Sequence, residues 1–149
     1  MQCQKGEIMA KVLNYGMVGG GPDAFIGDAH RRAISLDESA RLVAGVFSRN
    51  AEKSKKMGEV LYIEEERCYK DYETMALEEA KREDGIDFVV VVTPNASHYE
   101  ICKAFLNAGI HVVCDKPVTT TYEKAVELQK LAEEKSLLFM VTYTYMGHV

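Results

Sequence analysis

Short apolar runs alternate with helix-period stretches along the chain, and this alternation constrains its fold more than any other feature. Five runs have the length and composition of β-strands, at residues 12–18, 42–47, 86–92, 110–114 and 137–141. The third run is apolar on both of its faces, which a strand tolerates only when layers cover both sides of the sheet. Consecutive β-α-β units with right-handed crossovers therefore predict an α/β fold, a doubly wound parallel sheet with helices on both faces.

The segments between these runs carry helix start and stop signals. Four of the expected helices begin near Asn50, Tyr72, Ser97 and Thr120. Ser97 and Thr120 each open a capping-box pattern with a glutamate three residues further on, and Asn50 has a suitable side chain for an N-cap. Gly85 is expected to end the helix that begins near Tyr72, and a short strand is predicted at residues 60–63.

Length, charge and cysteine usage exclude several classes of protein. The 149 residues, 47% of them apolar, suffice for one core, so residues 1–149 are expected to form one domain. A net charge of -5 argues against nucleic-acid binding, which needs clustered Lys and Arg. The four cysteines have no C-x-x-C spacing, and no further ligands accompany His98 and Cys102, so we expect free thiols and no metal site. No apolar stretch has the length of a membrane span, which predicts a soluble, cytoplasmic protein.

A glycine-rich turn follows the first predicted strand and reads Gly19-Gly20-Gly21-Pro22-Asp23-Ala24-Phe25-Ile26-Gly27. Glycines at a strand-to-helix turn let the backbone approach a pyrophosphate, and the helix N-terminus presents free N–H groups. The third glycine of the usual fingerprint is replaced by Ala24, or is supplied by Gly27 in a longer loop. A turn that only reverses the chain is the alternative. We favour dinucleotide binding, with candidate contacts at Gly19, Gly21, Phe25, Ile26 and Gly27.

The end of the second predicted strand indicates which dinucleotide is preferred. A carboxylate there would accept hydrogen bonds from the 2′-hydroxyl of NAD, whereas an arginine accommodates the 2′-phosphate of NADP. The sequence has Ser48 and Arg49 at this place, with Lys53 one turn further, and no carboxylate. We therefore predict NADP, with NAD as the second possibility and Ser48, Arg49 and Lys53 as candidate contacts. The alternative is that Arg49 is an ordinary surface arginine.

The turn after the third predicted strand reads Thr93-Pro94-Asn95 and is followed by His98. In a doubly wound sheet this turn lies beside the glycine turn, where the nicotinamide ribose would run. Thr93, Pro94, Asn95 and His98 are therefore candidate cofactor contacts. A Pro-Asn turn that only begins the next helix would explain the same residues.

Asp115-Lys116-Pro117 follows the next predicted strand and reaches the same edge of the sheet. A lysine fixed between an aspartate and a proline has a restricted position, and a cis bond before Pro117 would turn it inward. Such a lysine can donate hydrogen bonds to a substrate oxygen or adjust the acidity of a neighbouring acid-base group. An ordinary surface lysine is the alternative.

These motifs occur together in a recognisable order. Gly19-x-Gly21 with His30 on the first helix, Thr93-Pro94-Asn95-x-x-His98 and Asp115-Lys116-Pro117 resemble the N-terminal domain of the Gfo/Idh/MocA family, named for glucose-fructose oxidoreductase, inositol dehydrogenase and rhizopine catabolism. The resemblance covers essentially the whole chain, although most members have glutamate in place of Asp115. It implies a Rossmann-like fold and an NAD(P)-dependent oxidoreductase that transfers a hydride to or from a sugar, polyol or related cyclic substrate. It also implies that Lys116 is the catalytic lysine and that Asp115, Lys116 and Pro117 all lie at the cofactor.

Members of this family are typically more than twice as long as this chain and have a second domain that builds the substrate site. We therefore expect residues 1–149 to be a dinucleotide-binding domain that lacks its substrate domain and is inactive alone. We expect the full-length protein to be a homo-oligomer. The alternative is a non-catalytic dinucleotide-binding or redox-sensing module. A methyltransferase using S-adenosylmethionine is a weaker alternative, because it would favour an acidic residue at Ser48-Arg49.

Overall fold

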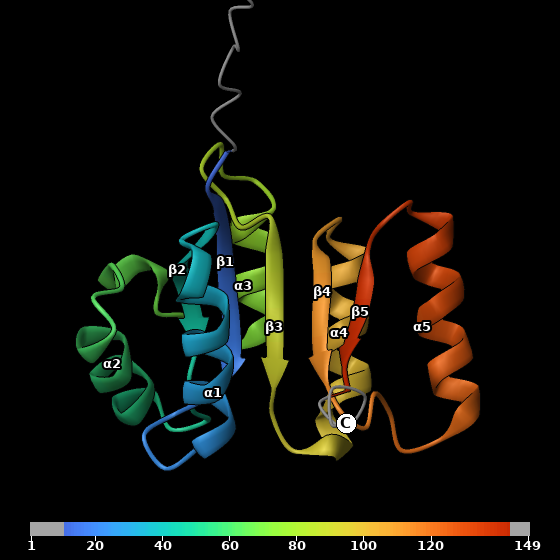
Figure 1. Ribbon diagram of the computed structural model, residues 1–149, viewed down its shortest axis with the longest axis horizontal. Helices are drawn as coiled ribbons and strands as arrows, with labels where there is room; N and C mark the ends of the chain where they lie inside the picture. The colour runs from blue at the N-terminus through green and yellow to red at the C-terminus, as the bar shows by residue number, and fades with distance from the viewer. Residues whose placement is uncertain (1–10, 144–149) are drawn as a thin grey trace, which may run out of the picture.

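The computed structural model describes residues 11–143 and contains a five-stranded parallel sheet with the strand order β2-β1-β3-β4-β5 (Figure 1). The strands are β1 (Leu13–Gly19), β2 (Ala40–Val46), β3 (Phe88–Val92), β4 (His111–Asp115) and β5 (Phe139–Thr142). All five predicted strands are confirmed, with small shifts at their ends. The arrowheads in Figure 1 point to one edge, so the turns after β1, β3 and β4 lie next to one another.

Helices cover both faces of this sheet, as the alternating pattern predicted. They are α1 (Phe25–Ile34), α2 (Ala51–Val60), α3 (Tyr72–Glu79), α4 (His98–Asn107) and α5 (Tyr122–Glu134). In Figure 1, α1 lies in front of the sheet, α3 and α4 lie behind it, and α2 lies beside the edge strand β2. Leu128 of α5 is in the same apolar cluster as residues of α3 and α4, so α5 packs on their side. The fold is therefore the predicted doubly wound α/β sheet. None of the helices within residues 11–143 has the length and apolar character needed to cross a membrane.

Strand β3 shows why its sequence is apolar at every position. Val89 and Val91 pack in the core cluster on the α3-α4-α5 side, whereas Val90 and Val92 pack in the cluster on the α1 side. All four valines are buried. Because each face of β3 is covered, a polar side chain on either face would lose its hydration without a partner. The polar residues that follow β3 therefore lie beyond its carboxyl end, from Thr93 onward, and not within the sheet.

Two of the expected helix caps differ from the prediction. Ser97 does not cap α4 with its side chain, because it lies in a short 3-10 turn and its hydroxyl donates to Pro94 O at 2.7 Å. Thr121, not Thr120, caps α5 by accepting from the Lys124 N–H at 3.4 Å. The Asn50 cap is confirmed, since its side chain accepts from the backbone N–H of Lys53 at 3.0 Å.

Two further expectations, both in the segment between β2 and β3, were wrong. Helix α3 ends at Glu79 and not at Gly85. Gly85 instead packs closely on the end of this helix, because a Cβ on Gly85 would lie 2.2 Å from the backbone oxygen of Glu79. No strand forms at residues 60–63, because α2 continues to Val60 and Tyr62 has a left-handed φ of 57°. Instead, Cys68 pairs with Gly45 at the outer edge of β2 and carries the chain to the carboxyl edge of the sheet.

Candidate functional site

A cleft of about 710 Å³ opens at the carboxyl edge of the sheet. This volume lies within the range of small-molecule and cofactor sites. Four segments form its walls: the glycine turn after β1, the end of β2 with the start of α2, the start of α3, and the turn after β3. Among the predicted cofactor contacts, the cleft is lined by Gly19, Gly21, Ser48, Arg49, Lys53, Thr93 and Pro94.

The glycine turn has a geometry that only glycine permits. Gly19 and Gly20 have φ values of 96° and 70°, and a Cβ on Gly19 would lie 2.7 Å from the Val92 carbonyl oxygen. A Cβ on Gly21 would lie 2.6 Å from the Phe47 oxygen, so the turn is pressed against the ends of both neighbouring strands. This close approach leaves the backbone of the turn as a wall of the cleft.

Gly27 takes the place of the third glycine. It is buried in α1, and a Cβ there would come within 2.3 Å of the Gly20 Cα. Its role is thus the close packing of the helix onto the turn, as the longer-loop interpretation expected. At the start of the helix, Ala24 offers no side-chain cap, so the N–H groups of the first turn are not satisfied by a capping side chain. A helix start of this kind is suited to a phosphate.

Arg31 was not among the predicted site residues, yet it holds the glycine turn from α1. Its Nη1 donates to the Gly20 carbonyl oxygen at 3.0 Å, and its side chain is only 13% exposed. Asp28, in the first turn of α1, is ion-paired with Arg32 at 2.8 Å and lies 3.9 Å from Arg31. The sequence signal was available, since Arg31 lies one turn after Gly27, but arginines at such positions usually face solvent.

We predict that Arg31→Met will weaken binding of a nicotinamide dinucleotide by about tenfold, because a charge-assisted hydrogen bond that orders the turn is lost. Isothermal titration with NADPH measures the change. Arg32→Met is the matched control. The Arg32 side chain is 81% exposed, and its ion pair is with Asp28, one helical turn earlier in α1. Equal affinities of the Arg31 variant and the wild type would show that the Gly20 contact does not order the site.

The end of the cleft formed by β2 and the start of α2 contains a carboxylate that sequence reasoning did not place there. Ser48, Arg49 and Lys53 line this end together, as predicted. Asp23 of the glycine turn also lines it and lies 3.6 Å from the Lys53 ammonium group. Both side chains are largely exposed, so this ion pair is weak and easily rearranged. Asp23 comes from another turn of the sheet, so reading only the residues that follow β2 does not find it.

The start of α3 forms another wall that the sequence did not reveal. Lys70, Asp71, Tyr72 and Glu73 all line the cleft. Burial, followed by a hydrogen bond with Glu73, raises the pKa of Tyr72 to about 12, so its phenol is neutral at physiological pH. The hydrogen bond from Tyr69 N–H to Gly45 O at 2.9 Å fixes this segment beside β2. The sequence predicts the helix that begins near Tyr72, but no motif indicates that its start lies in the cleft.

The turn after β3 places Thr93 and Pro94 in the cleft, whereas Asn95 is exposed beside it. Thr93 Oγ1 lies at hydrogen-bonding distance, 2.9 Å, from Ser97 Oγ, and this contact fixes the side chain of Thr93. His98 is only 1% exposed, and its two ring nitrogens lie at hydrogen-bonding distance from backbone carbonyl oxygens. His98 is therefore positioned to support the cleft wall and not to touch a bound molecule.

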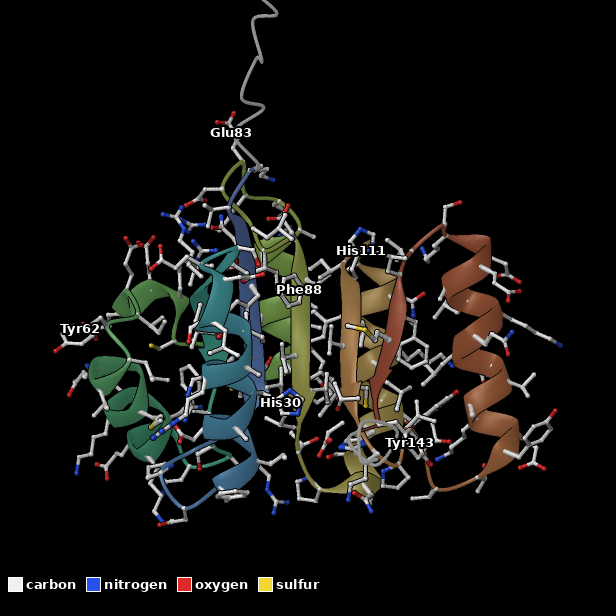
Figure 2. The ribbon with its side chains drawn as sticks, in the orientation of Figure 1. His30, Tyr62, Glu83, Phe88, His111 and Tyr143 are labelled. Carbon is white, nitrogen blue, oxygen red and sulfur yellow. The ribbon has the colours of Figure 1, made fainter. Side chains whose placement is uncertain are left out.

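Lys116 follows β4 and is partly buried at the same edge, one strand beyond Thr93. The peptide bond between Lys116 and Pro117 is cis, as considered from the sequence. Asp115 accepts a hydrogen bond from the Thr142 hydroxyl at 3.0 Å and lies 3.8 Å from His30 Nε2. Figure 2 shows His30 on the side of α1 that faces β3 and β4. Asp115, Lys116 and Pro117 lie outside the lining of the cleft itself.

Phe25 and Ile26 occupy the first turn of α1 and do not line the cleft. Phe25 is 86% exposed, whereas Ile26 packs against the core cluster on the α1 side. The structure thus brings together the glycine turn, the end of β2 and the turn after β3, and places the Lys116 turn next to them along the sheet edge.

The cleft has the features that a dinucleotide site requires. It has a glycine turn with no room for side chains, an uncapped helix start for a diphosphate, and polar walls at the end of β2 and β3. The fold and this cleft define a dinucleotide-binding domain of the Rossmann type. Residues 13–143 match the model of an oxidoreductase family described as having an NAD-binding Rossmann fold. The chain belongs to this family, Gfo/Idh/MocA, and the sequence-based identification is confirmed.

Named relatives support this assignment. The oxidoreductase YfiI of Bacillus subtilis is 46% identical over 142 residues, which is 95% of this chain and 36% of YfiI. The scyllo-inositol 2-dehydrogenase (NADP(+)) IolW of the same organism is 40% identical over 79 residues, or 52% of this chain and 22% of IolW. An inositol dehydrogenase homolog from Azotobacter vinelandii, solved with NADH and myo-inositol, has a TM-score of 0.90 at 43% identity and matches 93% of this chain and 37% of that one. The chain thus spans little more than a third of the relatives that it matches along most of its length.

Proposed function

We propose that residues 1–149 are the dinucleotide-binding domain of an oxidoreductase that transfers a hydride to or from a sugar, a polyol or a related cyclic compound. The observation that carries the proposal is the placement of the glycine turn and the Lys116 turn at one sheet edge, on either side of β3. The substrate class is supported by relatives whose names or bound molecules are inositols. In this proposal a second domain provides the substrate site, and the complete protein is a homo-oligomer. We also propose a cytoplasmic location, because the three free cysteines among the described residues fit a reducing compartment.

Each part of the site has a role in the proposal. The backbone of the glycine turn and the start of α1 bind the diphosphate, and Thr93 and Pro94 line the path toward the nicotinamide. The nicotinamide, when bound, supplies the hydride donor or acceptor. Lys116 donates an N–H to the reacting oxygen of the substrate, which stabilises negative charge on that oxygen as a carbinol proton leaves.

For the cofactor we propose a preference for NADP over NAD. The support is the group of Ser48, Arg49 and Lys53 at the adenosine end, which offers one hydroxyl and two cations to a 2′-phosphate. Asp23 favours NAD instead, because its carboxylate can accept hydrogen bonds from ribose hydroxyls. Relatives of both kinds are known, one named for NADP(+) and one solved with NADH.

Isothermal titration of the chain with NADPH and with NADH tests the proposed function. We expect saturable binding of both, with the tighter binding for NADPH. Arg49→Ala should raise the Kd of NADPH about tenfold and change that of NADH less than twofold, because only the 2′-phosphate contact is lost.

Lys56→Ala is the control for loss of a positive charge, because Lys56 is exposed on α2 and does not line the cleft. If the Arg49 variant weakened both cofactors equally, the NADP preference would be wrong while dinucleotide binding would stand. Absence of saturable binding of either cofactor at millimolar concentration would contradict the proposed function as a whole.

A further inference from the structure

His98 begins α4 and is buried between two turns of the candidate site. Its Nε2 lies 2.7 Å from the carbonyl oxygen of Thr93, at the end of β3. Its Nδ1 lies 2.8 Å from the carbonyl oxygen of Pro117, directly after the Lys116 turn. With only 1% of the residue exposed, water does not replace either partner. One imidazole ring therefore joins the two segments that carry Thr93 and Lys116.

The two partners determine the protonation state of the ring. A backbone carbonyl oxygen can only accept a hydrogen bond, so each ring nitrogen must donate. A neutral imidazole has one N–H and one lone pair, and either tautomer would direct a lone pair at a carbonyl oxygen. Only the doubly protonated imidazolium satisfies both contacts. The geometry thus indicates a positive charge at His98.

The surroundings of His98 are consistent with this charge. Burial acts to lower the pKa of His98, but the Cys114 side chain of β4 and the two carbonyl groups outweigh it and raise this pKa to about 9. Cys114 is itself hydrogen-bonded by Cys102 of α4, which together with His98 lowers the pKa of the Cys114 thiol to about 6 in spite of its burial. The Cys114 Sγ also lies 3.3 Å from the Asp115 carbonyl oxygen. These two thiols are the titratable groups that face the ring from β4 and α4.

We propose that His98 is a positioning residue that acts, at neutral pH, as a buried imidazolium and fixes the Lys116 turn relative to the turn after β3. The consequence for chemistry rests on the proposed function, because the Thr93 turn lines the cleft and Lys116 is the group offered to the substrate. Charge-assisted hydrogen bonds are shorter and stronger than neutral ones, so a cation holds the two turns more firmly than an amide or a neutral ring. In this role His98 holds the two turns in the positions seen in the structure, without a conformational change.

Nitrogen-15 NMR of the histidine side chains tests the charge directly, without any cofactor. In the wild-type chain at pH 7.5 we expect both ring nitrogens of His98 to show the shifts of protonated nitrogens, and to lose this signature only as the pH rises through about 9. The spectrum of His98→Gln assigns the signals. His111 provides an internal comparison, because its Nδ1 accepts from the Leu138 N–H at 3.0 Å and must be unprotonated in that contact. A neutral tautomer of His98 at pH 7.5 would overturn the proposal.

Cofactor binding then tests the positioning role. Between pH 7 and pH 9.5 the NADPH affinity of the wild type should fall by a factor at least three times larger than the factor for His98→Gln. The reason is that only the wild type loses a hydrogen bond when His98 is deprotonated. A purely structural His98 would give parallel pH profiles, and this result would also overturn the proposal. If neither protein binds NADPH, the proposed function fails, while the NMR result still decides the charge of His98. Where the variant does not fold, through-bond correlation of the ring nitrogens with the His98 backbone assigns the signals, and the NMR result still decides the charge.

Discussion

Gly27→Ala should abolish saturable binding of nicotinamide dinucleotides, with a loss of at least about 100-fold in affinity, equivalent to nearly 3 kcal/mol. The added Cβ would lie 2.3 Å from the Gly20 Cα and 3.2 Å from the Gly20 carbonyl carbon. Both are backbone atoms, so no side chain can rotate away to relieve the overlap. Either α1 must move outward or the glycine turn must change its path. In both cases the N–H groups at the helix start lose their relation to the turn, which is the part of the cleft suited to a diphosphate.

Gly109→Ala is the matched control for this substitution. Gly109 follows α4 at the opposite edge of the sheet and has a φ of 83°, but a Cβ there meets no atom within 4 Å. The control should lower the free energy of unfolding by about 1 kcal/mol through backbone strain and leave the cofactor Kd unchanged. Thermal unfolding and titration with NADPH measure the two effects in both variants. Unchanged affinity in Gly27→Ala would show that the packing of α1 on the turn is irrelevant to binding.

The order of strands and helices could be predicted because it depends on local patterns. Val89–Val92 is apolar on both faces wherever the segment is placed, and in the structure all four side chains are buried. The glycine turn was equally visible, since positive φ values at Gly19 and Gly20 require residues of this type. Both features are determined by the conformational limits of the chain itself.

Helix ends were less predictable, because several side chains compete for each cap. Ser97 has the right composition for a capping box, yet its hydroxyl is already used by Thr93 and Pro94 in the preceding turn. Thr120 and Thr121 are chemically equivalent candidates, and only the path of the chain from the Lys116 turn selects Thr121. A pattern of residue types contains neither piece of information.

Non-local contacts account for what was missed in the site. Asp23 reaches Lys53 across the carboxyl edge of the sheet, and Lys70 to Glu73 arrive there after a segment without periodicity. The sequence predicts a cofactor contact for His98 because His98 follows the turn beside the glycine turn, but the hydrogen-bonding partners of its ring are backbone carbonyl groups of two different turns. Sequence reasoning identified which turns meet at the sheet edge, and the structure separates the residues that line the cleft from those that hold it.

Lys116→Ala is expected to have the largest effect on turnover. When this chain is joined to a substrate domain, kcat should fall by about 10³-fold, because the proposed function assigns to Lys116 the stabilisation of charge on the reacting oxygen. The Kd of NADPH should change less than threefold, since Lys116 lies outside the lining of the dinucleotide cleft. Stopped-flow measurement of hydride transfer with a polyol, together with titration of NADPH, separates the two effects.

The controls for Lys116 distinguish catalysis from charge and from simple binding. Lys130→Ala removes an exposed lysine of α5 and should leave kcat and Kd unchanged. The 149-residue chain alone should bind NADPH and show no turnover, because in the proposed function the substrate is held elsewhere. Turnover by the chain alone would refute the need for a substrate domain. Full turnover in Lys116→Ala would show that Lys116 has no catalytic role, whereas absence of turnover in the wild type joined to a substrate domain would favour a non-catalytic dinucleotide-binding module.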